Sequence, residues 1–127
     1  MSAQTIRILI AGALFVHGIG HILGFFKPPR QGTFNLPDPT LRLLSGIFWA
    51  LAVVGFVVAS LSFYGILLPA NWWRPAAILF AAVSLVGLIL FGRSWPAFNF
   101  IGATALNVAV LVALLWLHWP PFEMFNR

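Results

Sequence analysis

The residues best suited to chemistry in this sequence are two histidines, His17 and His21, which interrupt an otherwise apolar stretch. Neutral imidazole is a common metal ligand, and histidine changes its charge near physiological pH. A separation of four residues puts both rings on the same face of a helix. The pair therefore predicts a binding or proton-handling site on one helix face.

Two glycines share this face, because Gly20 and Gly24 follow His17 at intervals of three and seven residues. Small residues in this pattern allow a neighbouring helix to approach closely. We therefore expect Gly20 and Gly24 to be helix-packing positions beside the two histidines.

The composition indicates that these helices lie in a membrane. Of the 127 residues, 61% are hydrophobic and only 7% are charged, whereas soluble domains carry about 25% charged residues. A soluble protein of this size would leave much of that apolar surface exposed. The sequence predicts one multi-pass membrane domain over residues 1–127, and we expect a bacterial inner membrane.

A helical membrane span needs about 20 mostly apolar residues. Short connections between successive spans favour antiparallel neighbours, so the fold class expected is an all-α, up-down bundle of four transmembrane helices. We interpret the first apolar run as a retained span, since no signal-peptide cleavage site follows it. The four predicted spans cover residues 5–26, 41–67, 75–91 and 97–119.

Prolines and charges mark the connections between the spans. Asp38 and Pro39 predict a helix start, with Asp38 as N-cap and Pro39 in the first helical position. The third span is the shortest. The lysines and arginines divide almost evenly between the two membrane faces, with a slight excess on the side of Lys27, which weakly favours a cytoplasmic location for that side. They are scattered singly, so a nucleic-acid partner is not expected.

A helical rise of about 1.5 Å per residue predicts that polar groups from all four spans lie at a similar depth. His17 and Asn107 both fall about 15 Å below the Lys27 side of the membrane, and the others fall about 9–12 Å below it. His118 lies near the opposite side and does not belong to this layer. The residues expected to form a buried polar layer that binds a ligand or cofactor are His17, His21, Trp49, Ser84, Thr104 and Asn107.

Several interpretations of this layer remain open. The polar groups can simply specify how the helices pack. Alternatively, His17 and His21 can hold a metal ion, or a tetrapyrrole can take one of them as its axial ligand. Intramembrane histidines also occur in proton relays and transporters. An enzyme is the less favoured class, because no nucleophile–base pair or phosphate loop is evident.

We favour a small accessory or interaction subunit whose polar layer around His17 and His21 binds a cofactor or small ligand. The alternative is a dimeric transporter or proton-coupled carrier, although no carboxylate lies inside a predicted span. In both cases the partners expected are the lipid bilayer and either a second copy of the chain or a larger membrane complex.

The first span also resembles that of the DoxX-like family of small bacterial membrane proteins. The likeness rests on Arg7, the apolar run that follows it to Phe15, and the continuation to Gly24. It implies the same four-span plan, and some members act beside redox enzymes that use quinone, which implies an accessory redox role. His17 and His21 depart from the family pattern in this region, so no residue role is carried over.

Overall fold

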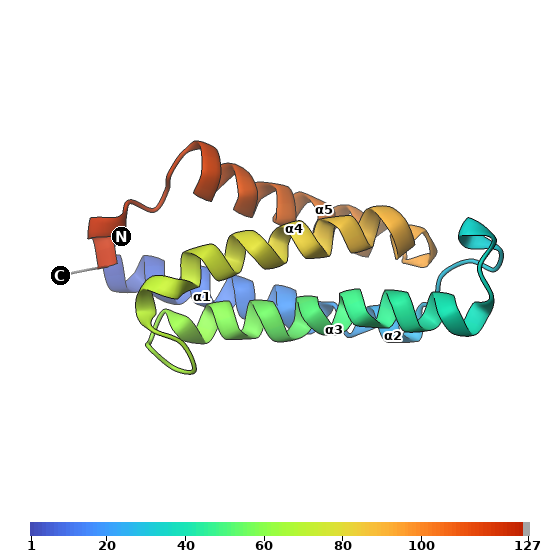
Figure 1. Cartoon of the computed structure of the whole chain (residues 1–127). Coiled ribbons are helices and arrows are strands. Elements are labelled where there is room, and N and C mark those ends of the chain that lie inside the picture. The colour runs from blue at the N-terminus through green and yellow to red at the C-terminus, as the bar shows by residue number, and fades with distance from the viewer. Residues whose placement is uncertain (126–127) are drawn as a thin grey trace.

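The protein is an antiparallel up-down bundle of four long helices in the computed structural model, which describes residues 1–125 (Figure 1). Four segments, Ala3–Phe26, Asp38–Ser62, Ala70–Ser94 and Ala97–Trp116, are long and apolar enough to cross a bilayer. The predicted fold class is confirmed, and the chain is a multi-pass membrane protein. The main helices are α1 (Ala3–Gly20), α2 (Leu23–Phe26), α3 (Asp38–Ser62), α4 (Trp73–Phe91) and α5 (Ala97–Leu111).

The helix ends differ from the sequence prediction in three places. The second span ends at Ser62 rather than Leu67, because the chain turns there through left-handed backbone at Gly65 and Leu67. The third span is not short, since a 3₁₀ turn on each side extends it to 25 residues. Asp38 is the first residue of α3 rather than its N-cap, and its carboxylate accepts a hydrogen bond from Gln31.

The end of α5 widens into a π-helical turn, Val112–Trp116. There the guanidinium of Arg74 donates a hydrogen bond to the carbonyl of Leu114 (3.0 Å). A 3₁₀ turn, Phe122–Phe125, then folds back so that Arg7 donates to the Phe125 carbonyl (2.8 Å). The C-terminal segment is thereby held against the start of α1, and the two termini lie at the same end of the bundle (Figure 1).

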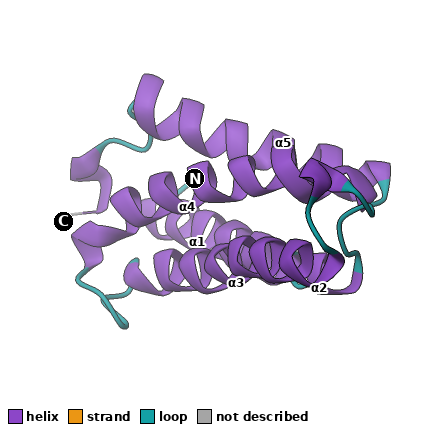
Figure 2. Ribbon diagram, turned by 45° about the vertical axis from the view of Figure 1, so that its right-hand side comes forward, coloured by secondary structure: helices purple, strands orange, loops and turns teal. Residues whose placement is uncertain are grey.

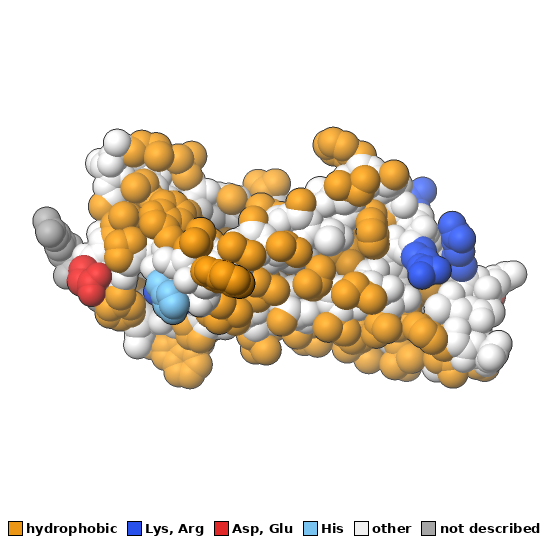
Figure 3. All heavy atoms as spheres, turned by 90° about the horizontal axis from the view of Figure 1, so that it is seen from above, with side chains coloured by type: hydrophobic (Ala, Val, Ile, Leu, Met, Phe, Trp, Pro, Cys, Tyr) orange, Lys and Arg blue, Asp and Glu red, His pale blue; other side chains and the backbone are white. Residues whose placement is uncertain are grey.

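The four spans do not contact one another equally. α3 packs closely against both α1 and α4. α5 packs along α4 and makes few contacts with α1 (Figure 2). Large apolar side chains cover much of the outer surface, and Lys and Arg gather mainly at one end of the face drawn in Figure 3. An apolar outer surface with charges at its ends suits a protein that is solvated by lipid.

Candidate functional site

The two histidines lie where the first span bends. α1 ends at Gly20, and α2 begins at Leu23 after a short turn. His21 is the C-cap of α1, and its Nδ1–H donates a hydrogen bond to the His17 carbonyl (2.9 Å). This bond fixes the His21 ring against its own helix and directs Nε2 toward α4.

The remaining polar groups connect three spans through one chain of hydrogen bonds. His17 Nε2–H donates to Asn107 Oδ1 (2.9 Å), and Asn107 Nδ2–H donates to Ser84 Oγ (2.7 Å). Ser84 Oγ also lies 2.6 Å from His21 Nε2. Since His21 already donates through Nδ1, Nε2 of a neutral His21 accepts a hydrogen bond that the Ser84 hydroxyl donates. The chain thus joins α1, α5 and α4 within about one helical turn of depth.

Burial makes this pairing necessary. Asn107 and Ser84 are 0% exposed and His21 is 1% exposed, and Asn107 is the one buried residue of α5. Unpaired polar groups are costly in apolar surroundings. With both imidazoles neutral, every hydrogen bond of the chain has one donor and one acceptor. The arrangement also uses both nitrogens of His21 and leaves Nδ1 of His17 free.

Aromatic rings enclose the histidine pair. Phe56 contacts His17 with a centroid separation of 4.6 Å, whereas Trp49 and Trp95 lie 6.1 and 5.8 Å from His21. The indole N–H groups of Trp49 and Trp95 are buried without an acceptor. Trp49 therefore lies beside the polar layer at the predicted depth, but its contact with His21 is between rings rather than through a hydrogen bond.

Thr104 does not join the hydrogen-bonded chain, although it lies one turn before Asn107 on α5. Its hydroxyl oxygen is buried without a partner. Thr104 therefore shares the buried region with Asn107, but its side chain does not reach a donor or acceptor of the chain.

The two predicted packing glycines have different environments. A Cβ added to Gly24 would lie 2.5 Å from the indole of Trp49, so α3 approaches closely there. A Cβ added to Gly20 would meet no atom within 4 Å. The structure thus does not place Gly20 at the close helix contact that its spacing predicts. Gly18 takes that role, since its added Cβ would lie 2.8 Å from the Cβ of Phe56.

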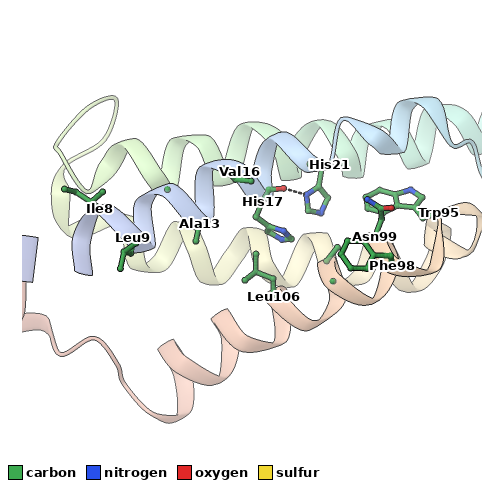
Figure 4. A pocket seen from close by; sticks show the side chains of 14 residues that line it. Ile8, Leu9, Ala13, Val16, His17, His21, Trp95, Phe98, Asn99 and Leu106 are labelled. Atoms are coloured by element: carbon green, nitrogen blue, oxygen red, sulfur yellow. Dashed lines mark hydrogen bonds between the residues drawn. The ribbon is translucent and has the colours of Figure 1, made fainter. Parts of the chain in front are cut away.

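Gly20 instead lines an open groove between α1 and α5, with a volume of about 760 Å³ (Figure 4). Gly12 and Gly102 also line it, and a Cβ added at either would meet no atom within 4 Å. His17 projects from α1 into this space, while Leu106 lies on the α5 side. The groove therefore brings the His17 ring, whose Nδ1 has no hydrogen-bond partner, to a surface that opens sideways from the bundle.

Two groove residues that carry hydrogen-bonding side chains, Trp95 and Asn99, were not predicted as site residues. Trp95 forms part of the groove lining at one end, and the exposed amide of Asn99 lies beside Trp95 in Figure 4. A signal for Asn99 is present in the sequence, because Asn99, Ala103 and Leu106 recur at helical spacing on one face of α5. Nothing local distinguishes Trp95 from the other tryptophans at the membrane interface.

A second cavity of about 190 Å³ continues the groove toward the other end of α5. It shares Ala13 and Leu106 with the first groove and is lined by apolar residues that include Leu14 and Trp119. Together, the two spaces extend from the level of Asn99 to that of Ala113, about 21 Å along a helix axis.

Few side chains near the site could bind a metal ion. The described residues contain no cluster of three or more His, Cys, Asp and Glu side chains suited to a metal ion. His118 lies at the far end of α5 and bonds the Trp116 carbonyl through Nδ1. In the hydrogen-bonded arrangement, His17 Nδ1 is the one imidazole nitrogen of the pair that remains available as a ligand.

No family model, curated protein or solved structure matches this chain. Its fold and site therefore define only a class: a small four-helix membrane protein with a buried His–Asn–Ser–His chain and a laterally open groove beside it.

Proposed function

We propose that this protein is a small membrane-embedded subunit that binds a neutral, largely apolar molecule in the groove between α1 and α5. The observation that carries the proposal is His17, whose ring lines this groove and whose Nδ1 has no partner, whereas the other side-chain polar groups of the hydrogen-bonded chain are paired. A neutral imidazole nitrogen accepts a hydrogen bond. The bound molecule therefore carries a hydroxyl or a comparable donor at the depth of His17.

The size and lining of the groove support a ligand of this kind. Small-molecule sites usually have volumes of about 300–1,000 Å³ and mainly apolar walls with few polar groups. The groove has a volume of about 760 Å³, and its lining contains no Lys, Arg, Asp or Glu. A charge at this depth would lack a counter-ion and would be costly. An uncharged head and an apolar body that extends into the cavity near Leu14 fit best.

A metal or tetrapyrrole is a narrower version of the same proposal. His17 Nδ1 offers one ligand, which suits a single axial position. A chelate by both His17 and His21 would require His21 to give up a hydrogen bond, either to Ser84 or to the His17 carbonyl. An absorption spectrum and metal analysis of the purified protein distinguish this version, because an organic amphiphile gives neither a Soret band nor bound metal.

The geometry favours binding over proton-coupled transport. The hydrogen-bonded chain starts at the His17 ring and returns to the His17 carbonyl through His21. Its members lie within about one helical turn of one another along the bundle, so the chain does not extend to either membrane face. A carrier function would need further groups above and below this level.

The remaining parts of the proposal concern the setting. We place the protein in a bacterial inner membrane, as an accessory subunit that works with a second copy or a larger complex. The lateral opening of the groove supports a partner or lipid at this side, since α5 leaves α1 largely uncovered. The resemblance to DoxX-like proteins favours a redox complex as the setting.

The test is to identify small molecules that co-purify with the protein in mild detergent, by mass spectrometry and absorption spectroscopy. Gly20→Leu fills the groove at a position with open space, so the specific ligand should be lost while the fold is kept. Ala50→Leu is the matched control, because it enlarges an exposed residue of α3 outside the groove. Equal ligand content in the two variants would overturn the proposal.

A further inference from the structure

A different groove lies at the Lys27 end of the bundle, between the first connection and the end of α4. Its volume is about 420 Å³, and two arginines, Arg30 and Arg93, line it together with apolar residues that include Phe34, Ile89 and Phe91. Arg93 belongs to the 3₁₀ turn that follows α4, at the level where a span leaves the apolar part of the membrane. The groove thus combines two cations with an apolar floor at a membrane interface.

No carboxylate lines this groove. Asp38 accepts a hydrogen bond from Gln31, and Glu123 belongs to the 3₁₀ turn at the opposite end of the bundle. Arg30 and Arg93 are both suited to binding an anion. The planar guanidinium of arginine can donate two parallel hydrogen bonds to a phosphate. The arginines therefore offer an anion site that the chain itself does not fill.

Contacts within the protein hold the first connection, which forms one wall of this groove, against the end of α4. Phe34 and Asn35 both have left-handed backbone, at φ values of 55° and 54°, which is unusual for residues other than glycine. The Phe34 ring meets Phe91 edge-on at 6.1 Å, and the Ser94 hydroxyl donates a hydrogen bond to the Lys27 carbonyl (3.1 Å). These contacts hold the loop, and with it Arg30, beside the end of α4.

We propose that this groove binds the headgroup of an anionic phospholipid, with the phosphate between Arg30 and Arg93 and an acyl chain along Phe34 and Ile89. Both apolar residues are well exposed, so they are available to a lipid chain. Basic pockets between transmembrane helices are known sites for anionic lipid headgroups. An anionic lipid at this groove also fits the cytoplasmic location expected for the Lys27 side, because anionic lipids are enriched in the cytoplasmic leaflet and basic residues on that side of membrane proteins.

The experiment adds phosphatidylglycerol to the detergent-solubilised full-length protein and measures bound lipid by native mass spectrometry. Arg30→Gln and Arg93→Gln should each reduce binding about tenfold, because each removes a charge-assisted contact to the phosphate. Arg93→Lys should bind at an intermediate level, since it keeps the charge and loses the paired donors. Phosphatidylcholine should bind to the native protein no better than phosphatidylglycerol binds to a variant that carries both Arg30→Gln and Arg93→Gln.

Arg42→Gln is the matched control, because it removes the same charge from the same end of the bundle outside this groove. It should change binding less than twofold. If Arg42→Gln weakens binding as much as Arg93→Gln, the attraction is a diffuse surface charge and the proposal is wrong. Inorganic phosphate that competes fully at equal concentration would also overturn it, in favour of a free-anion site. Unchanged thermal midpoints without added lipid would show that the variants fold.

Discussion

The two sides of the first span, Ala3–Phe26, carry similar glycines in opposite environments. Toward α3, an added Cβ at Gly18 or Gly24 would collide with Phe56 or Trp49. Toward α5, an added Cβ at Gly12 or Gly20 would meet no atom within 4 Å. One side of the helix is a close-packed seam, and the other side is the wall of a groove.

This contrast shows that a small residue in a membrane helix has two distinct uses. Lipid tails are as apolar as helix side chains, so close van der Waals packing must hold the α1–α3 seam together. On the α5 side, the same absence of a side chain leaves room for a molecule that is not part of the chain. The polar layer joins the two sides, because His17 packs on Phe56 and bonds Asn107.

The largest effect should separate the two sides of α1 directly. Gly18→Leu places a branched side chain against α3, where even a Cβ is too close, so overpacking should lower the free energy of unfolding by about 3 kcal/mol. Gly20→Leu should leave the free energy of unfolding unchanged or slightly raised, since leucine favours helix more than glycine does. Thermal unfolding in detergent, followed by circular dichroism, measures both variants. Similar losses of stability would mean that the α5 side is packed as tightly as the α3 side.

A smaller loss of stability should come from breaking the hydrogen bonds that join α1 to α5 and α4 beside the groove. Asn107→Ala leaves His17 Nε2 without its partner and removes one of the two hydrogen bonds of Ser84 Oγ. Interhelical hydrogen bonds in membranes are worth about 0.6 kcal/mol on average and 1.7 kcal/mol at most. We expect a loss of about 1–2 kcal/mol over the two bonds. Equilibrium unfolding in mixed micelles checks this value. Asn99→Ala, on the same helix but exposed, is the control and should stay near the native stability.

The smallest effect is expected at Thr104. Its buried hydroxyl has no partner, so Thr104→Val replaces an unsatisfied polar group with a methyl group of similar shape. The free energy of unfolding should stay the same or rise by less than about 1 kcal/mol. The same unfolding assay applies. A clear loss of stability would show that Thr104 belongs to the polar layer together with Asn107.

Much of the site was predictable because helix geometry is regular. A constant rise per residue brings His17, Ser84 and Asn107 to one depth, and the hydrogen bonds among them confirm that they share a layer. Spacing within one helix also relates His17 to His21. Which neighbour each residue meets depends on the rotation of the helices about their axes, and no local pattern gave that. Gly20 and Asn99 illustrate this limit. The spacing of Gly20 predicted a close helix contact, and Asn99 was not predicted as a site residue, yet both line the groove.

The sequence by itself determined the four apolar spans, their antiparallel order and the depth of the polar groups, because hydropathy, proline positions and helical rise are properties of short segments. The tertiary structure alone decided that α5 packs on α4 and stands away from α1. That choice arises from the summed packing of side chains far apart in the chain. It turned one face of α1 into a groove that His17 lines.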